Sequence, residues 1–144
     1  MSRFECAGIG FGLFYLEISM NLMTKDVKVF VPAMNFADSF KFYTAMGWTA
    51  DWKADDGSLA VLALGESRFY LQNYYHKDWA NNFMMHITVE DAQAWYEHAA
   101  EVISEGGYKY ARLKAPQKEA YGALVTFVWD PSGVLLHFAQ FLNN

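Results

Sequence analysis

The sequence predicts an α+β fold built from two tandem β-α-β-β-β units. Three observations predict it: apolar side chains recur at every second position in several segments, two further segments carry them at helical spacing, and turn-forming residues separate the segments. The same order of segments occurs twice along 144 residues, a length that suits one domain with one core. Such a repeat predicts pseudo-symmetry and curved mixed sheets around a cavity.

The first unit begins with a strand. Val27, Val29 and Val31 stand at every second position, which is the spacing of a strand with one face on a core. A helix should follow, because Asn35 is a good N-cap residue and Gly47 is suited to ending a helix. Three strands are then expected at residues 48–53, 59–64 and 69–74.

The second unit repeats this order after a loop expected at residues 75–82. A strand is expected at residues 83–89, and Asp91 can cap the helix that Gly106 and Gly107 end. Three more strands are expected at residues 108–113, 123–129 and 134–141.

Composition excludes several classes of function. Eleven basic and sixteen acidic residues give a formal charge of −5, and no stretch gathers Lys and Arg, which disfavours nucleic acid or an anionic membrane as the main partner. Cys6 is the only cysteine, so the chain can form neither an internal disulfide nor a paired thiolate site for zinc. A reducing, cytoplasmic location fits this cysteine content.

Residues 1–24 are interpreted as an N-terminal extension of a domain that spans residues 25–144. The apolar run at residues 7–16 is too short to cross a bilayer, and the charge pattern and cleavage site of a secretory signal are missing. The alternative is an added edge strand or a partner-binding arm, because the large apolar side chains would otherwise be exposed.

Four short motifs occur in the order found in one known superfamily. They are Ser39-x-x-Phe42-Tyr43 followed by Met46-Gly47-Trp48, then Val89-Glu90-Asp91, Tyr121-Gly122 and Asp130-Pro131-Ser132-Gly133. On these motifs the chain resembles, over about residues 25–142, the vicinal oxygen chelate superfamily of glyoxalase I, bleomycin-resistance proteins and extradiol dioxygenases. The resemblance implies a glyoxalase/bleomycin-resistance-like fold and a homodimer.

In metal-using members of this superfamily, four inward-facing strand positions hold the ion. The resemblance places these positions at Lys28, Gln72 (or Leu71), Met84 and His137. An ammonium group cannot ligate a metal, a thioether is a soft ligand, and an amide is a poor partner for a borderline transition metal. The resemblance therefore implies that the ancestral metal site is lost and that the protein uses no cofactor.

An alternative metal site remains open. Strand alternation places Met84 and His86 on one face, so His86 and His137 could converge and bind a divalent metal with Glu66 or Glu119. The simpler interpretation is that each histidine is a polar group of a core or pocket.

Aromatic side chains are the stronger functional signal, because aromatic walls bind flat or cationic ligands. Tyr70, Tyr75 and Trp79 lie at or just after the strand expected to border the cavity. The expected ligand-binding residues are Lys28, Tyr70, Gln72, Tyr75, Trp79, Met84, His86, Tyr121 and His137.

The resemblance implies a metal-free protein that binds and sequesters an aromatic or cationic small molecule, as bleomycin-resistance proteins do. The alternative is a lyase, isomerase or dioxygenase of the same superfamily that uses a divalent metal held by His86 and His137. No catalytic residue is assigned, since the sequence lacks a nucleophile elbow, a P-loop and an H-E-x-x-H motif.

Overall fold

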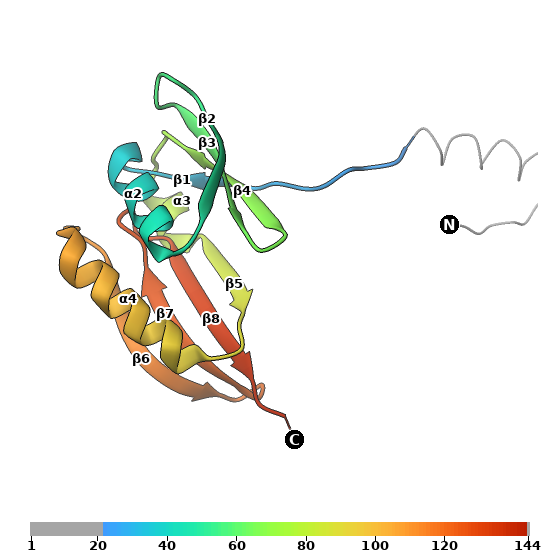
Figure 1. The fold of residues 1–144 in the computed structure, drawn as a ribbon, viewed down its shortest axis with the longest axis vertical. Coiled ribbons are helices and arrows are strands. Elements are labelled where there is room, and N and C mark those ends of the chain that lie inside the picture. The colour runs from blue at the N-terminus through green and yellow to red at the C-terminus, as the bar shows by residue number, and fades with distance from the viewer. Residues whose placement is uncertain (1–21, 144) are drawn as a thin grey trace, which may run out of the picture.

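Two four-stranded mixed sheets, each with a helix, make up the computed structural model, which describes residues 22–143 (Figure 1). The predicted apolar run at residues 7–16 lies outside the described residues. The first unit contains β1 (Phe30–Pro32), α2 (Phe36–Met46), β2 (Thr49–Lys53), β3 (Leu59–Leu64) and β4 (Ser67–Gln72). Its strands are ordered β1-β4-β3-β2, with β1 parallel to β4, and form the first sheet.

The second unit has the same topology. After the connecting helix α3 (Lys77–Asn82), it contains β5 (Met84–Thr88), α4 (Ala92–Gly106), β6 (Arg112–Glu119), β7 (Ala123–Trp129) and β8 (Leu135–Phe141). Its strands are ordered β5-β8-β7-β6, with β5 parallel to β8, and form the second sheet. The predicted α+β class and the predicted repeat are therefore confirmed, although the two sheets stay separate and do not close.

The predicted ends of both long helices are confirmed. The side chain of Asn35 accepts a hydrogen bond from the backbone N–H of Asp38, and Asp91 accepts one from Ala94 in the same way. Gly47 follows α2 with a φ of 131°, a backbone conformation that residues other than glycine rarely adopt.

One hydrophobic core joins the two units. Trp95 of α4 stacks on Phe138 of β8, and Trp48 of the first unit meets Phe138 edge-on at 6.5 Å between ring centroids. Phe42 and Leu71 of the first unit are fully buried in this same cluster, so the two units share the main core.

A buried polar cluster also ties the first unit to the turn between β7 and β8. The hydroxyl of Tyr43 donates a 2.6 Å hydrogen bond to Asp130, and the hydroxyls of Ser39 and Ser132 lie 3.2 Å apart. The backbone N–H of Met34 donates to Ser132. Burial raises the pKa of Asp130 to about 6, while its hydrogen bonds act in the opposite direction. The motifs that carry the family resemblance therefore join the two units.

The first strand is shorter than predicted. β1 begins at Phe30, and Val27 is 84% exposed and belongs to no strand. Because β1 pairs with β4 alone, at the edge of the sheet, its beginning has no second neighbour to hold it. β4 also begins two residues earlier than predicted, at Ser67.

The predicted loop at residues 75–82 is wrong, because it contains α3. This helix has no side-chain cap, since His76 at its N-cap makes no such hydrogen bond, and six residues are too few for a periodic pattern. Its only buried residue is Ala80.

The strand predicted at residues 108–113 is also misplaced, because β6 spans Arg112–Glu119. Tyr108 instead meets Phe42 edge-on at 5.5 Å between centroids, so the chain enters the core before the strand begins. β6 contains Pro116, a residue that is rare inside strands. It is tolerated here because β6 is an edge strand and its register shifts between Lys114 and Gln117.

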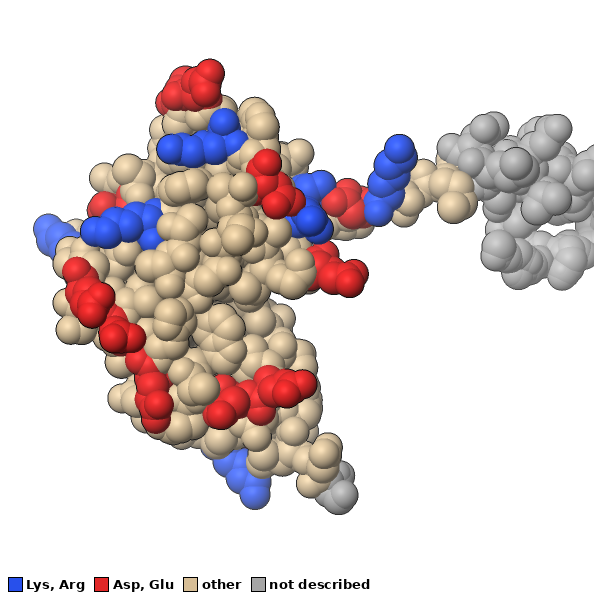
Figure 2. All heavy atoms as spheres, in the orientation of Figure 1, with Lys and Arg blue, Asp and Glu red and all other residues tan. Residues whose placement is uncertain are grey.

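The surface carries no basic patch on the face that Figure 2 shows. Acidic side chains follow α4, which carries Glu97, Glu101 and Glu105 at intervals of four residues, while basic side chains are scattered. Within residues 22–143, no helix combines the length and apolar character needed to cross a bilayer.

Candidate functional site

The second sheet has one face covered by α4 and one face, here called the open face, that no helix or strand of residues 22–143 covers. Trp95 of α4 stacks on Phe138 with ring centroids 4.5 Å apart, so Phe138 points toward the helix. Neighbouring residues of a strand point to opposite faces, which places His137 on the open face. His86 of β5 and Phe127 of β7 are directly opposite His137, and directly paired residues share a face. The structure therefore brings together the two histidines singled out from the sequence.

Five rings gather on this open face, which we call the histidine–aromatic face: His86, Tyr121, Phe127, His137 and Phe141. The His86 ring centroid lies 6.0 Å from that of His137 and 5.9 Å from that of Phe141. The Tyr121 centroid lies 6.3 Å from that of His86. Tyr121 and Phe141 are 55% and 50% exposed. Grouped exposed rings of this kind mark a surface that a ligand or partner covers.

Small side chains form the base of this face. Ala123, Val125 and Ala139 are fully buried in a cluster separate from the main core, and Phe127 packs against them. In the sheet, Val125 is paired with Ala139, and Ala123 is paired with Phe141. Because these small side chains are fully buried, the apolar surface that this face exposes belongs to the rings, above all Tyr121 and Phe141.

His137 supplies an unsatisfied polar atom on this face. Its Nε2 is buried and has no hydrogen-bond partner among residues 22–143. Burial lowers the pKa of His137, the nearby His86 lowers it further, and Glu119 opposes the shift. The ring is therefore neutral at neutral pH, with one nitrogen that donates and one that accepts. Leaving a buried polar atom unpaired costs about 1–3 kcal/mol, so a ligand that pairs with it is favoured.

Two other predicted residues, Tyr70 and Gln72, lie on the first sheet, and Lys28 lies two residues before its strand β1. The Nζ of Lys28 is 5.8 Å from the Tyr70 ring centroid and 2.6 Å from the Asp26 carboxylate, whose hydrogen bond raises the pKa of Lys28. Phe30 stacks on Tyr70 at 4.8 Å. Gln72 follows Tyr70 by two positions in β4 and so shares its face. Each sheet thus carries part of the predicted ligand-binding set.

Tyr75 and Trp79 lie on the connection between the two sheets. Tyr75 packs against the main core. The Trp79 ring is 5.9 Å from that of Tyr74 and 6.2 Å from that of Phe83, between centroids. These contacts give both residues a packing role where α3 joins the units.

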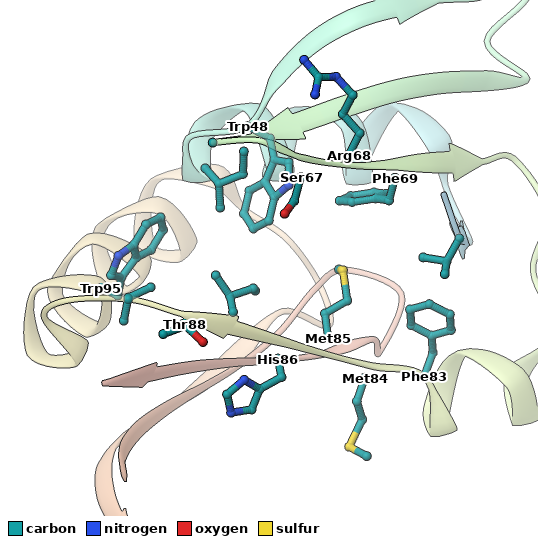
Figure 3. Close-up of a pocket in the computed structure, with 15 residues that line it drawn as sticks. Trp48, Ser67, Arg68, Phe69, Phe83, Met84, Met85, His86, Thr88 and Trp95 are labelled. Carbon is teal, nitrogen blue, oxygen red and sulfur yellow. The ribbon is translucent and has the colours of Figure 1, made fainter. Parts of the chain in front are cut away.

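A groove of about 720 Å³ lies between β4 and β5 (Figure 3). Trp48 and Phe69 line it from the first unit and Met85 lines it from the second. Figure 3 shows Met85 pointing toward Phe69, while Met84 and His86 point to the opposite side of β5. The groove is therefore lined by side chains of the main core, and the histidine–aromatic face lies on the other side of β5.

The side chains present do not fit the four-ligand metal site of the superfamily. Lys28 precedes β1, Gln72 lies on the first sheet, and Met84 and His137 lie on the second sheet. Of these four residues, only His137 is a good ligand for a borderline transition metal. His86 adds a second imidazole, but no group of three or more His, Cys, Asp or Glu side chains suited to a metal occurs among residues 22–143. Catalytic zinc sites normally use three protein ligands.

Comparison with known proteins shows the fold. No protein-family model and no curated protein sequence matches the chain. The structure is similar to the bleomycin resistance determinant encoded on the transposon Tn5, with a TM-score of 0.68, and to the bleomycin-binding protein from Streptomyces verticillus complexed with copper(II)-bleomycin, with a TM-score of 0.67. Each is 21% identical, and each alignment covers 83% of this chain and 100% of the other.

A third similar structure is a glyoxalase/bleomycin resistance protein/dioxygenase from Nocardioides. Its TM-score is 0.66 at 12% identity, and the alignment covers 94% of this chain and 95% of the other. The chain therefore has the fold of these bleomycin-resistance and glyoxalase/bleomycin resistance/dioxygenase structures, which is the fold that the resemblance predicted.

Proposed function

We propose that this protein binds and sequesters an aromatic or cationic small molecule on the histidine–aromatic face, without a metal. One observation carries the proposal: five rings, two of them at least half exposed, surround small buried side chains and an unpaired buried nitrogen of His137. The fold supports it, because similar structures include a bleomycin-binding protein and a bleomycin resistance determinant.

The chemistry of the face suits such a ligand. A flat aromatic group can stack on Tyr121 and Phe141, where it buries apolar area that is now exposed to water. The Nε2 of His137 can pair with a donor or acceptor of the ligand. Glu119 is close enough to raise the pKa of His137, so its carboxylate can favour a ligand with positive charge.

Thermal unfolding with ligand probes tests this function. Metal-free bleomycin and benzyltrimethylammonium serve as probes, because one is a large glycopeptide and the other a minimal aromatic cation. A ligand at a hundred times its Kd stabilises a protein by about 2.7 kcal/mol. For a domain of this size that is a rise in Tm of roughly 10 °C.

Matched variants locate the binding site. Tyr121→Ala and Phe141→Ala should each weaken binding at least tenfold, because each removes an exposed ring from the face. Tyr110→Ala is the control, since Tyr110 is also about half exposed but belongs to the segment before β6. If the control weakens binding as much as the two site variants, the ligand binds elsewhere.

A metal-dependent lyase, isomerase or dioxygenase is the second candidate. The pairing of His86 with His137 on adjacent strands favours it, because two imidazoles are the start of a metal site. Metal content of the purified protein, measured by mass spectrometry beside His137→Ala, decides between the two. If the wild type contains a stoichiometric transition metal and the variant does not, the metal-dependent enzyme is favoured and the metal-free binding proposal is wrong.

A further inference from the structure

Two basic side chains border the histidine–aromatic face on β6, the strand at the edge of the second sheet. Arg112 and Lys114 stand on either side of Leu113, and Leu113 packs against the main core. Neighbouring residues of a strand point to opposite faces, so the two cations point to the open face. The register agrees, because Lys114 is directly opposite Phe127, a ring of that face, and Arg112 is opposite Trp129.

Each of the two cations lies over an aromatic ring of β7. The guanidinium carbon of Arg112 is 3.9 Å from the Trp129 ring centroid, and the Nζ of Lys114 is 5.9 Å from the Phe127 centroid. Such contacts attract the cation to the ring and restrict its side chain. A guanidinium over a ring still has N–H groups along its edge that can donate to a ligand. Both positive charges are therefore held beside the aromatic surface before any ligand arrives.

No acidic side chain neutralises these cations. Among residues 22–143, the ion pairs lie on or just before the first sheet, so neither Arg112 nor Lys114 has an ion-pair partner there. Glu119 is on the same strand but at its other end. Unpaired cations are common on protein surfaces. These two differ in their position, because they adjoin the rings and the unpaired nitrogen of His137.

The cations and the histidines form one row across the second sheet. Lys114 of β6 is opposite Phe127 of β7, Phe127 is opposite His137 of β8, and His137 is opposite His86 of β5. Neighbouring strands are about 4.8 Å apart, so Lys114 and His137 are separated by roughly 10 Å of sheet. A bicyclic aromatic acid has this length. Its rings can cover Phe127 and reach the Nε2 of His137 while its acid group meets the cations.

We propose that the ligand of this face is an aromatic carboxylate, and that Arg112 and Lys114 hold its anionic group at the β6 edge. The inference rests on the proposed function, because it names the ligand class of the same face. A guanidinium donates two parallel hydrogen bonds to a carboxylate, and the ammonium of Lys114 adds a second positive charge. Glu119 favours a positive charge at the far end of the strand, so an aromatic zwitterion would match both ends.

Calorimetry with 2-naphthoate and 2-naphthamide tests the ligand class, because the two probes share their rings and differ in charge. The wild type should bind 2-naphthoate about tenfold more tightly, and added salt should reduce this preference. The double variant R112Q/K114Q should bind both probes equally. The control K109Q/K118Q removes the same charge away from the face and should keep the preference, since Lys109 precedes β6 and Lys118 points to its other side.

Charge reversal provides a test that depends on a gain of binding. The variant R112E/K114E should bind 2-naphthylmethylammonium more tightly than 2-naphthoate, and its Tm without ligand should show that it is folded. A variant R112Q/K114Q that keeps the preference, or a control that loses it, would overturn the proposal.

The same probes separate this inference from the function on which it rests. If the wild type binds 2-naphthoate and 2-naphthamide equally and Tyr121→Ala weakens both, the carboxylate site is wrong and the aromatic binding face stands. If the wild type binds none of the three naphthyl probes, the carboxylate site and the aromatic binding face are both wrong.

Discussion

Tyr43→Phe tests whether the buried polar cluster holds the two units together. The substitution removes only the hydroxyl that donates a 2.6 Å hydrogen bond to Asp130. The ring keeps its edge-on contacts with Phe42, Trp48 and Phe69, at centroid distances of 5.4, 5.2 and 5.2 Å. The loss of stability therefore reports the hydrogen bond and not a cavity.

The magnitude depends on pH because Asp130 titrates. Burial raises the pKa of its carboxyl to about 6 in the folded protein, against about 3.9 in an unfolded chain. Between these values the unfolded chain binds fewer protons, so stability falls as pH rises, by about 3 kcal/mol for a difference of about 2 units. The Tyr43 hydrogen bond lowers the pKa of Asp130, so its removal raises that pKa and deepens the fall.

We expect Tyr43→Phe to cost about 1 kcal/mol at pH 4.5, where Asp130 is protonated, and about 2–3 kcal/mol at pH 8, where it is charged. Urea unfolding followed by tryptophan fluorescence at both pH values measures the two costs. Tyr110→Phe, at an exposed ring, is the control and should change neither value. An equal loss at both pH values, or a loss below about 0.5 kcal/mol at pH 8, would refute this account of Asp130.

Substitutions at three further positions test other features. Gly133→Ala should lower stability by at least 1–2 kcal/mol in thermal unfolding, because Gly133 has a φ of 95° and an added Cβ would lie 2.9 Å from the side-chain oxygen of Asn81; unchanged stability would contradict this geometry. Asn35→Ala should cost about 1 kcal/mol in urea unfolding because it removes the cap of α2, and Asn35→Asp, which can still cap, should cost little. His137→Phe should weaken ligand binding about tenfold in calorimetry. If a nitrogen of His137 accepts a hydrogen bond from the ligand, the affinity of the wild type should fall as pH falls through the lowered pKa of His137. An affinity that does not change with pH would show that this nitrogen does not accept a hydrogen bond from the ligand.

Local signals in the sequence were sufficient for the fold. The caps at Asn35 and Asp91, the glycine after α2 and the order of the strand patterns are short-range features, and the structure confirms them. The errors arose where tertiary contacts decide where a strand begins and ends. Alternation alone extended the first strand to Val27, which has no neighbouring strand in the structure. The strand β6 contains Pro116, which is tolerated there because β6 lies at the edge of its sheet.

The candidate site could be predicted only in part. Alternation placed Met84 and His86 on one face, but the pairing of His86 with His137 depends on the register of two strands about fifty residues apart. Phe141 was not singled out, although it follows His137 by four positions on one strand and so shares its face. The groove was missed because residues such as Met85 have the pattern of a core strand.

The buried polar cluster has a consequence for how the chain folds during synthesis. Tyr43 and Asp130 are 87 positions apart, Ser39 and Ser132 are 93 apart, and Met34 and Ser132 are 98 apart. At ribosomal speeds of roughly 5–20 residues per second, the first unit waits about 5–20 s for these partners. During that interval the hydroxyls on α2 must stay hydrated, and the unit cannot reach its final packing. Truncation of the nascent chain before Asp130 should therefore leave an incompletely packed first half that is exposed to chaperones and proteases.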